Sequence, residues 1–283
     1  MAEERELKVS FLSKNKIICP LCSTIFHREE LLSGSGRLIA GNITDELHRL
    51  YEPSMKYGDV YPLVYQATVC PECWYAAMDK DFVELKDRQN KGVADAAKRV
   101  ADTKLIFPDV DFHNGRDLKS GAASQYLVTR CYDYFPKEYS PTIKQGIAAL
   151  RTSWLLDELH NKFPGEHYDW LSGLFKRKAQ FFYTEALERE QNQSELLSGL
   201  KSCGPDTDKN YAYEGIIYLT GLLTYKYGSK NNSELRENQL SSIKINIARI
   251  FGLGKASKNK PSPLLEHAKG LYANINKELH ESD

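Results

Sequence analysis

The chain has 283 residues, enough for one large domain or two modest ones. Its 38 Lys and Arg residues equal its 38 Asp and Glu residues, so the formal net charge is zero. Proteins that bind duplex DNA or anionic membranes usually carry a basic excess, which this chain lacks overall. An apolar fraction of 41% supports a folded core and argues against low-complexity disorder.

The first residues, Met1 to Lys8, contain no basic segment followed by an apolar one, which argues against a secretory signal. No stretch approaches the roughly 18 apolar residues that cross a membrane. We therefore expect a soluble, cytoplasmic protein without a membrane partner. Thiols stay reduced in the cytoplasm, so paired cysteines there favour metal binding over disulfides.

Two matched Cys-Pro-x-Cys motifs, here called the knuckles, dominate a first unit that we place at residues 9–78. They are Cys19-Pro20-Leu21-Cys22 and Cys70-Pro71-Glu72-Cys73. Each follows a short predicted strand, at 17–18 and at 65–69, as in zinc ribbons. Four thiolates complete a tetrahedral zinc site and leave no open position for catalysis, so we predict that the four cysteines bind structural Zn²⁺. The rival interpretation is a thioredoxin-like redox pair, which needs only one such motif, in a βαβ setting.

Between the knuckles we expect a strand at 37–40 and a short helix that begins at Thr44 and ends before Pro53. Thr44 would cap this helix, and the two acidic residues that follow would favour its first turn. The glycine-containing stretch 33–37 lacks the Lys-Ser/Thr ending and following helix of a phosphate-binding loop. We interpret it as a flexible loop.

Residues 79–115 predict a charged, alanine-rich connecting helix and a linker, and residues 116–283 predict a helical domain. The helix expected near 140–162 has Ser140 as its N-cap and Pro141 in its first turn. Its apolar stripe, with steps of three and four residues, is Ile143, Ile147, Leu150, Trp154, Leu155 and Leu159. Similar stripes occupy 171–186, 212–223, 240–250 and 264–279.

Helices that recur in pairs with short connections indicate a tetratricopeptide-like array. The interval is irregular and the consensus is only partly met, so an ordinary helical bundle stays the alternative. The predicted fold class is α+β, mainly α, with a small zinc-ribbon-like N-terminal unit followed by a tetratricopeptide-like helical array.

Other residues with possible chemistry carry weaker signals. His27 could replace one thiolate, but the four cysteines already complete the site. His48 and His113 have no partner at a legible spacing and are interpreted as surface or capping residues. Cys131 lies in an apolar helix and is expected to be buried, whereas Cys203, in a Gly-Pro turn, is expected to be more exposed. Neither is marked as a nucleophile.

No pair of catalytic carboxylates is predicted. Asp157 and Glu158, and also Glu188 and Glu190, are interpreted as solvated helix faces. Residues 241–260 carry five Lys and Arg residues and no acidic residue. That stretch is either a patch for RNA, DNA or an acidic protein, or a basic helix end with its linker.

The knuckles with their flanks, Cys19 to Phe26 and Val69 to Ala77, resemble a bacterial family known as domain of unknown function 2225. The resemblance extends to Arg37-Leu38, Arg116, the Tyr126 to Tyr134 helix and Ala148 to Leu156, and covers about residues 10–230. It implies an N-terminal cysteine-rich zinc unit followed by tetratricopeptide-like helices. It implies no particular activity.

Three functions are compatible with these features. The first is a cytoplasmic, zinc-containing binding or scaffold protein whose helical array binds a protein or peptide. The second, which the net charge does not favour, is nucleic-acid binding by the zinc unit. Its basic residues would be Lys14, Lys16, Arg28 and Arg37. The third is an enzyme with a site between the zinc unit and the helices, which a cluster of His48, Glu52 and tyrosines would support. No catalytic residue is assigned.

Overall fold

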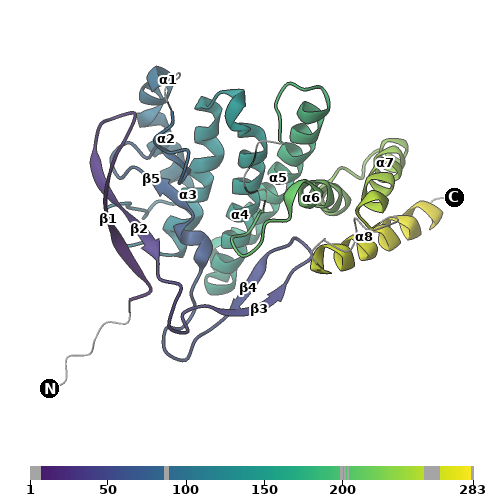
Figure 1. The fold of residues 1–283 in the computed structure, drawn as a ribbon, viewed down its shortest axis with the longest axis horizontal. Helices are drawn as coiled ribbons and strands as arrows, with labels where there is room; N and C mark the ends of the chain where they lie inside the picture. Colours follow the sequence, from purple (N-terminus) through teal and green to yellow (C-terminus); the bar gives the residue numbers. More distant parts are fainter. Residues whose placement is uncertain are drawn as a thin grey trace.

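The computed structural model describes residues 8–85, 89–197, 200, 202, 204–251 and 262–281. Figure 1 shows β1, β2 and the short helices α1 and α2 toward one end of the molecule, helices α3 to α8 following across it, and β3 and β4 below the helices in this view. The strands and 3₁₀ turns are β1 (Ser10–Ile18), β2 (Ile25–Leu31), β3 (Ile39–Ile43), β4 (Arg49–Glu52), β5 (Ala67–Val69), β6 (Ala76–Met78), η1 (Pro62–Tyr65), η2 (Tyr132–Tyr134), η3 (Lys137–Tyr139) and η4 (Pro164–Glu166). The helices are α1 (Gln89–Ala94), α2 (Ala96–Ile106), α3 (Leu118–Cys131), α4 (Pro141–Lys162), α5 (Tyr168–Gln191), α6 (Ala212–Tyr227), α7 (Ser233–Phe251) and α8 (Ser262–Glu281). The class α+β, mainly α, is confirmed.

The strands form separate antiparallel hairpins, β1–β2, β3–β4 and β5–β6. Strands precede both knuckles as predicted, because β1 ends at Ile18 and β5 ends at Val69. Ile18 pairs with Ile25, and Val69 pairs with Ala76, so each knuckle is the turn of a hairpin.

The two knuckle hairpins differ in burial. All of β5 and the first two residues of β6 are buried, and this hairpin packs against α3. By contrast, β1 is exposed at most of its positions. The second hairpin therefore belongs to the core, whereas the first lies at the surface.

The helix expected from Thr44 does not form, and this prediction was wrong. The chain makes the β3–β4 hairpin, and its turn is closed by the Thr44 N–H donating to the His48 carbonyl (2.8 Å). The Thr44 hydroxyl accepts the His48 N–H (3.2 Å), so the intended cap serves the turn. Leu47 adopts φ 59° and is fully buried, which means that tertiary packing holds the turn in a left-handed conformation. The strand expected at 37–40 begins at Ile39.

The long helices occur where the apolar stripes predict them. Helix α4 buries all six residues of its stripe. Its cap differs from the prediction, because Ser140 has φ 48° and its hydroxyl donates to the Leu196 carbonyl. The Glu195 carboxylate instead accepts the Thr142 N–H (2.7 Å) and hydroxyl (2.7 Å). A remote residue thus satisfies the first turn of α4.

Helices pack mainly on their neighbours along the chain: α3 on α4, α4 on α5, α5 on α6, α6 on α7 and α7 on α8. The elements around the knuckles join this layer through α3, where η1 approaches closely. A Cβ placed on Gly121 would lie 2.6 Å from Val64 Cγ2, so only glycine permits this approach. No described helix combines the length and apolarity needed to cross a membrane.

Candidate metal centre

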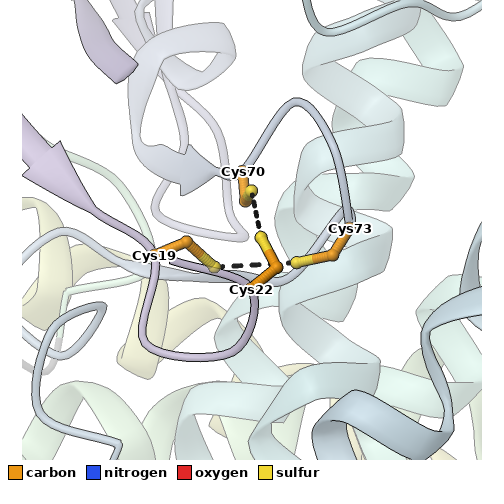
Figure 2. Close-up of side chains that lie close together, drawn as sticks. All are labelled: Cys19, Cys22, Cys70 and Cys73. Carbon is orange, nitrogen blue, oxygen red and sulfur yellow. Dashed lines mark hydrogen bonds between the residues drawn. The ribbon is translucent and has the colours of Figure 1, made fainter. Parts of the chain in front are cut away.

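The two knuckles have the same backbone geometry. In the first, the Ser23 N–H donates to the Cys19 carbonyl (3.0 Å), and in the second the Trp74 N–H donates to the Cys70 carbonyl (3.0 Å). The residue after the last cysteine is left-handed in both, with φ 61° at Ser23 and 56° at Trp74. This repeated turn directs both cysteines of each knuckle toward one centre, as Figure 2 shows.

The four sulfurs converge although the knuckles are far apart in the sequence. Cys19 Sγ lies 3.6 Å from Cys73 Sγ, and Cys22 Sγ lies 3.4 Å from Cys70 Sγ. All four lie within 4.8 Å of one another. Four sulfurs at 2.3 Å from a tetrahedral zinc would be separated by about 3.8 Å, whereas a disulfide needs about 2.0 Å. The site therefore has the donor set and spacing to hold a metal ion.

Close contact makes the pKa values of the Cys19, Cys70 and Cys73 thiols unequal. A hydrogen bond with the Cys70 thiol, aided by burial, raises the pKa of Cys19 to about 12. Hydrogen bonds with Cys19 and Cys73 lower the pKa of Cys70 to about 2. The hydrogen bond with Cys19 raises the pKa of Cys73. A first thiolate thus opposes further ionisation nearby, and a divalent cation would remove that opposition.

A buried arginine on α2 supports the second knuckle. The Arg99 guanidinium is 0% exposed and donates to the Cys73 carbonyl through Nε (3.0 Å) and Nη2 (2.6 Å). Its Nη1 donates to the Gly92 carbonyl (3.0 Å) and to the Tyr134 hydroxyl (3.2 Å). Four thiolates and a divalent ion carry a net charge of −2, so the guanidinium would offset part of it. In the sequence alone, Arg99 is one of several charged residues of the predicted connecting helix, and nothing marks it as a partner of the knuckles.

Helix α1 also reaches the first knuckle. The Leu21 side chain packs so closely on Gly92 that a Cβ there would lie 2.8 Å from Leu21 Cδ1. Gly92 thus contacts the first knuckle through Leu21. Its carbonyl also accepts a hydrogen bond from Arg99, which in turn binds the second knuckle at Cys73.

The other predicted candidates lie outside this centre. His27 is exposed and hydrogen-bonds the Ser13 carbonyl through Nδ1 (2.7 Å). His113 lies beside the second knuckle but contacts Asp111 (2.9 Å) and Glu72 (3.0 Å), and these hydrogen bonds raise its pKa. A surface or capping role was predicted for His113. Cys131 is fully buried, as predicted, and burial raises its pKa to about 11.

The basic residues that could serve nucleic acid differ in availability. Lys14 and Lys16 are exposed. Arg28 forms an ion pair with Asp79, and Arg37 donates to the Lys8 and Gly34 carbonyls. Cys203 and residues 252–260 of the basic stretch lie outside the described residues. Within the described part of that stretch, Lys244 donates to the Asn276 side chain on α8 (2.5 Å).

His48 and Glu52, which with tyrosines would form the cluster expected of an enzyme, do not share one environment. His48 is half-buried and contacts Asp206, whereas Glu52 is exposed. Glu158 was predicted to lie on a solvated helix face. It is instead partly buried and lines a cavity together with His48. Asp157 forms an ion pair with Lys176 (2.7 Å).

A four-cysteine centre between two hairpins, set against packed helices, defines a mainly helical protein with a site able to hold a metal ion. The sequence profile of a family described as "Uncharacterized protein conserved in bacteria (DUF2225)" matches residues 12–275, and the chain belongs to this family. The match extends past residue 230 and includes α7. A similar protein, an "Uncharacterized protein" of Borreliella burgdorferi, is 40% identical over 273 residues, which are 96% of this chain and 98% of that protein. No solved structure matches the chain.

Proposed function

We propose that this protein is a cytoplasmic binding or scaffold protein in which a structural zinc ion fixes two hairpins against a tetratricopeptide-like array that binds a protein or peptide. The proposal keeps the division into a zinc unit at 9–78, a connecting helix and linker at 79–115 and a helical domain at 116–283. Packing of each helix on its chain neighbours supports an array, because such stacks expose an extended binding surface.

The observation that carries the structural role of zinc is the unequal burial of the hairpins. Two ligands come from a core hairpin and two from a surface hairpin. An ion held by all four thiolates would cross-link the surface hairpin to the core. Such an ion would have no open position for substrate.

A cavity of about 890 Å³, lined by Met78 at the end of β6 and by residues of η3 and α4, supports the binding role. Met78 from β6 and Ile147 from α4 supply apolar lining, and Lys80, Lys137 and Glu138 supply charge of both signs. Leu196, which is 54% exposed, lies at the same cavity. Apolar and charged lining together suit a peptide segment better than a small apolar ligand.

The test is capture of partners from the native cell by the full chain, with Leu196→Asp as the cavity variant and Leu105→Asp as its control. Leu105 is 85% exposed on α2 and lies outside the cavity lining. A protein retained by the wild type and by Leu105→Asp, but lost with Leu196→Asp, would support the proposal. Equal retention by both variants would contradict it.

The same capture at raised salt and with nuclease tests the alternative. Material that is lost on nuclease treatment, and on charge reversal of Lys14 and Lys16, would favour nucleic-acid binding by the zinc unit.

A further inference from the structure

The turn of the β3–β4 hairpin inserts among the helices through two acidic side chains. Asp45 forms an ion pair with Lys226 of α6 (2.7 Å). The Glu46 carboxylate accepts the indole N–H of Trp154 (2.6 Å) and the Tyr227 hydroxyl (2.7 Å). Contacts from α4 and α6 thereby fix the position of the turn and of His48, two residues after Glu46.

His48 is held in one orientation by a buried carboxylate and an aromatic ring. Its Nδ1 lies 2.5 Å from the Asp206 carboxylate, whose side chain is 1% exposed. Its ring stacks on Trp154 with centroids 4.2 Å apart and planes 11° apart. Burial opposes ionisation of Asp206, but hydrogen bonds from His48, Thr207 and Arg49 outweigh it and lower its pKa. An ionised carboxylate can only accept, so the Nδ1–H of His48 donates to Asp206, and Nε2 is the ring atom left for another partner.

A carboxylate lies in the same cavity, one helical turn from Trp154. The cavity has a volume of about 230 Å³, and both His48 and Glu158 line it. Burial raises the pKa of Glu158, and among the described residues no hydrogen bond or ion pair involves its carboxylate. The apolar and aromatic lining includes Leu50, Tyr51, Val60, Tyr61, Leu63 and Leu155. We call this cavity the His48 pocket.

The fixed charges around the His48 pocket favour a cation. Two ion pairs cancel internally: Arg49 with Asp208 (2.8 Å) and Lys162 with Asp59 (3.2 Å). The Arg151 guanidinium offsets the charge of Asp206, so the Glu158 carboxylate is the charge left without an ion-pair partner among the described residues. Partly buried charges interact strongly because water screens them less than it screens surface charges.

We infer that the His48 pocket binds a small organic ammonium compound, with its NH₃⁺ group between the Glu158 carboxylate and His48 Nε2 and its apolar body against the tyrosine and leucine walls. The volume is below the range of about 300–1,000 Å³ for drug-sized ligands, so the occupant is a small metabolite. This site is separate from both the cysteine centre and the cavity at Leu196.

The test uses the full, metal-loaded chain with two probes of the same shape, benzylamine and the neutral benzyl alcohol. Ligand-observed NMR and calorimetric titration measure their affinities. We expect benzylamine to bind about tenfold more tightly than the alcohol, since a charge-assisted hydrogen bond contributes at least this factor. Glu158→Gln should remove the preference, and His48→Gln should weaken benzylamine binding.

Glu188→Gln is the matched control, because it makes the same change on an exposed part of α5. It should retain the wild-type preference. The inference is wrong if the wild type binds neither probe at millimolar concentration, if it binds both equally, or if Glu158→Gln keeps the preference. The two probes on the wild type decide the matter even if a variant fails to fold.

Discussion

Removal of the metal should release the β1–β2 hairpin while the helices stay folded. This hairpin supplies Cys19 and Cys22, and most of β1 is exposed. Its remaining anchors to the body are few. They include the ion pair of Arg28 with Asp79 and a hydrogen bond from the Arg116 N–H to Glu29 (2.8 Å).

The magnitude follows from what the hairpin buries. Its partly buried apolar side chains on the core are Ile17, Leu21, Phe26 and Leu31. Half-burial of each contributes about 1 kcal/mol, and the two polar contacts add about 1 kcal/mol each. Ordering the side chains that make these contacts costs about 4 kcal/mol of the total of about 6 kcal/mol, which leaves about 2 kcal/mol. The hairpin adds little stability of its own, since an isolated two-stranded hairpin is marginally stable at best.

We therefore expect the metal-free hairpin to open at a cost of about 2 kcal/mol or less, which corresponds to about thirtyfold protection of its amides at most. A structural zinc contributes about 10–16 kcal/mol, so the loaded protein should protect them at least a thousandfold.

Hydrogen exchange followed by mass spectrometry, before and after chelation, measures this difference. Amides of α4 serve as the internal control and should change little. The reasoning is refuted if peptides from residues 10–31 keep their protection once elemental analysis shows that the metal has gone.

Further predictions concern the supports of the fold and the His48 pocket. Arg99→Met should lower metal retention against a chelator by about 10- to 100-fold. Lys98→Met, on the exposed side of α2, should leave metal retention unchanged. Equal metal retention by the two variants would contradict the role of the Arg99 guanidinium. In thermal unfolding, Gly173→Ala should stabilise the protein by about 0.5–1 kcal/mol, because no atom lies near the added Cβ. Gly121→Ala should destabilise the protein, because its Cβ would press against Val64. A change of the same sign for both variants would contradict this packing. Burial raises the pKa of Glu158 in the folded protein above its pKa in the unfolded chain. The stability that the protonated Glu158 side chain allows is therefore fully present below the unfolded-chain pKa, and it is lost as the pH rises through the folded-state pKa. Glu158→Gln should therefore match the wild type at about pH 4 and exceed it at about pH 7, and a constant difference across this range would count against the burial.

The knuckles and the long helices could be predicted because their signals are local. A Cys-Pro-x-Cys turn specifies its own geometry, and the stripe of α4 marks the face that is buried. Four cysteines also imply one another, since a tetrahedral site requires that number. The sequence thus predicted that the four cysteines converge, without any knowledge of long-range contacts.

The His48 pocket could not be predicted, because its parts meet only in the folded chain. His48 and Asp206 are 158 residues apart, and no spacing rule joins them. Tertiary contacts of Asp45 and Glu46 also override the helix signal at Thr44. The same holds for Glu195 as the remote cap of α4, since local reasoning names the adjacent serine.

The central claim is that Cys19, Cys22, Cys70 and Cys73 hold one structural zinc ion. Elemental analysis combined with X-ray absorption on the purified full chain tests it most directly. The account predicts about one zinc per chain, with four sulfur neighbours at about 2.3 Å, and loss of both in Cys19→Ser. Less than about half an equivalent of metal, or a Cys19→Ser variant that folds and binds metal unchanged, would contradict it.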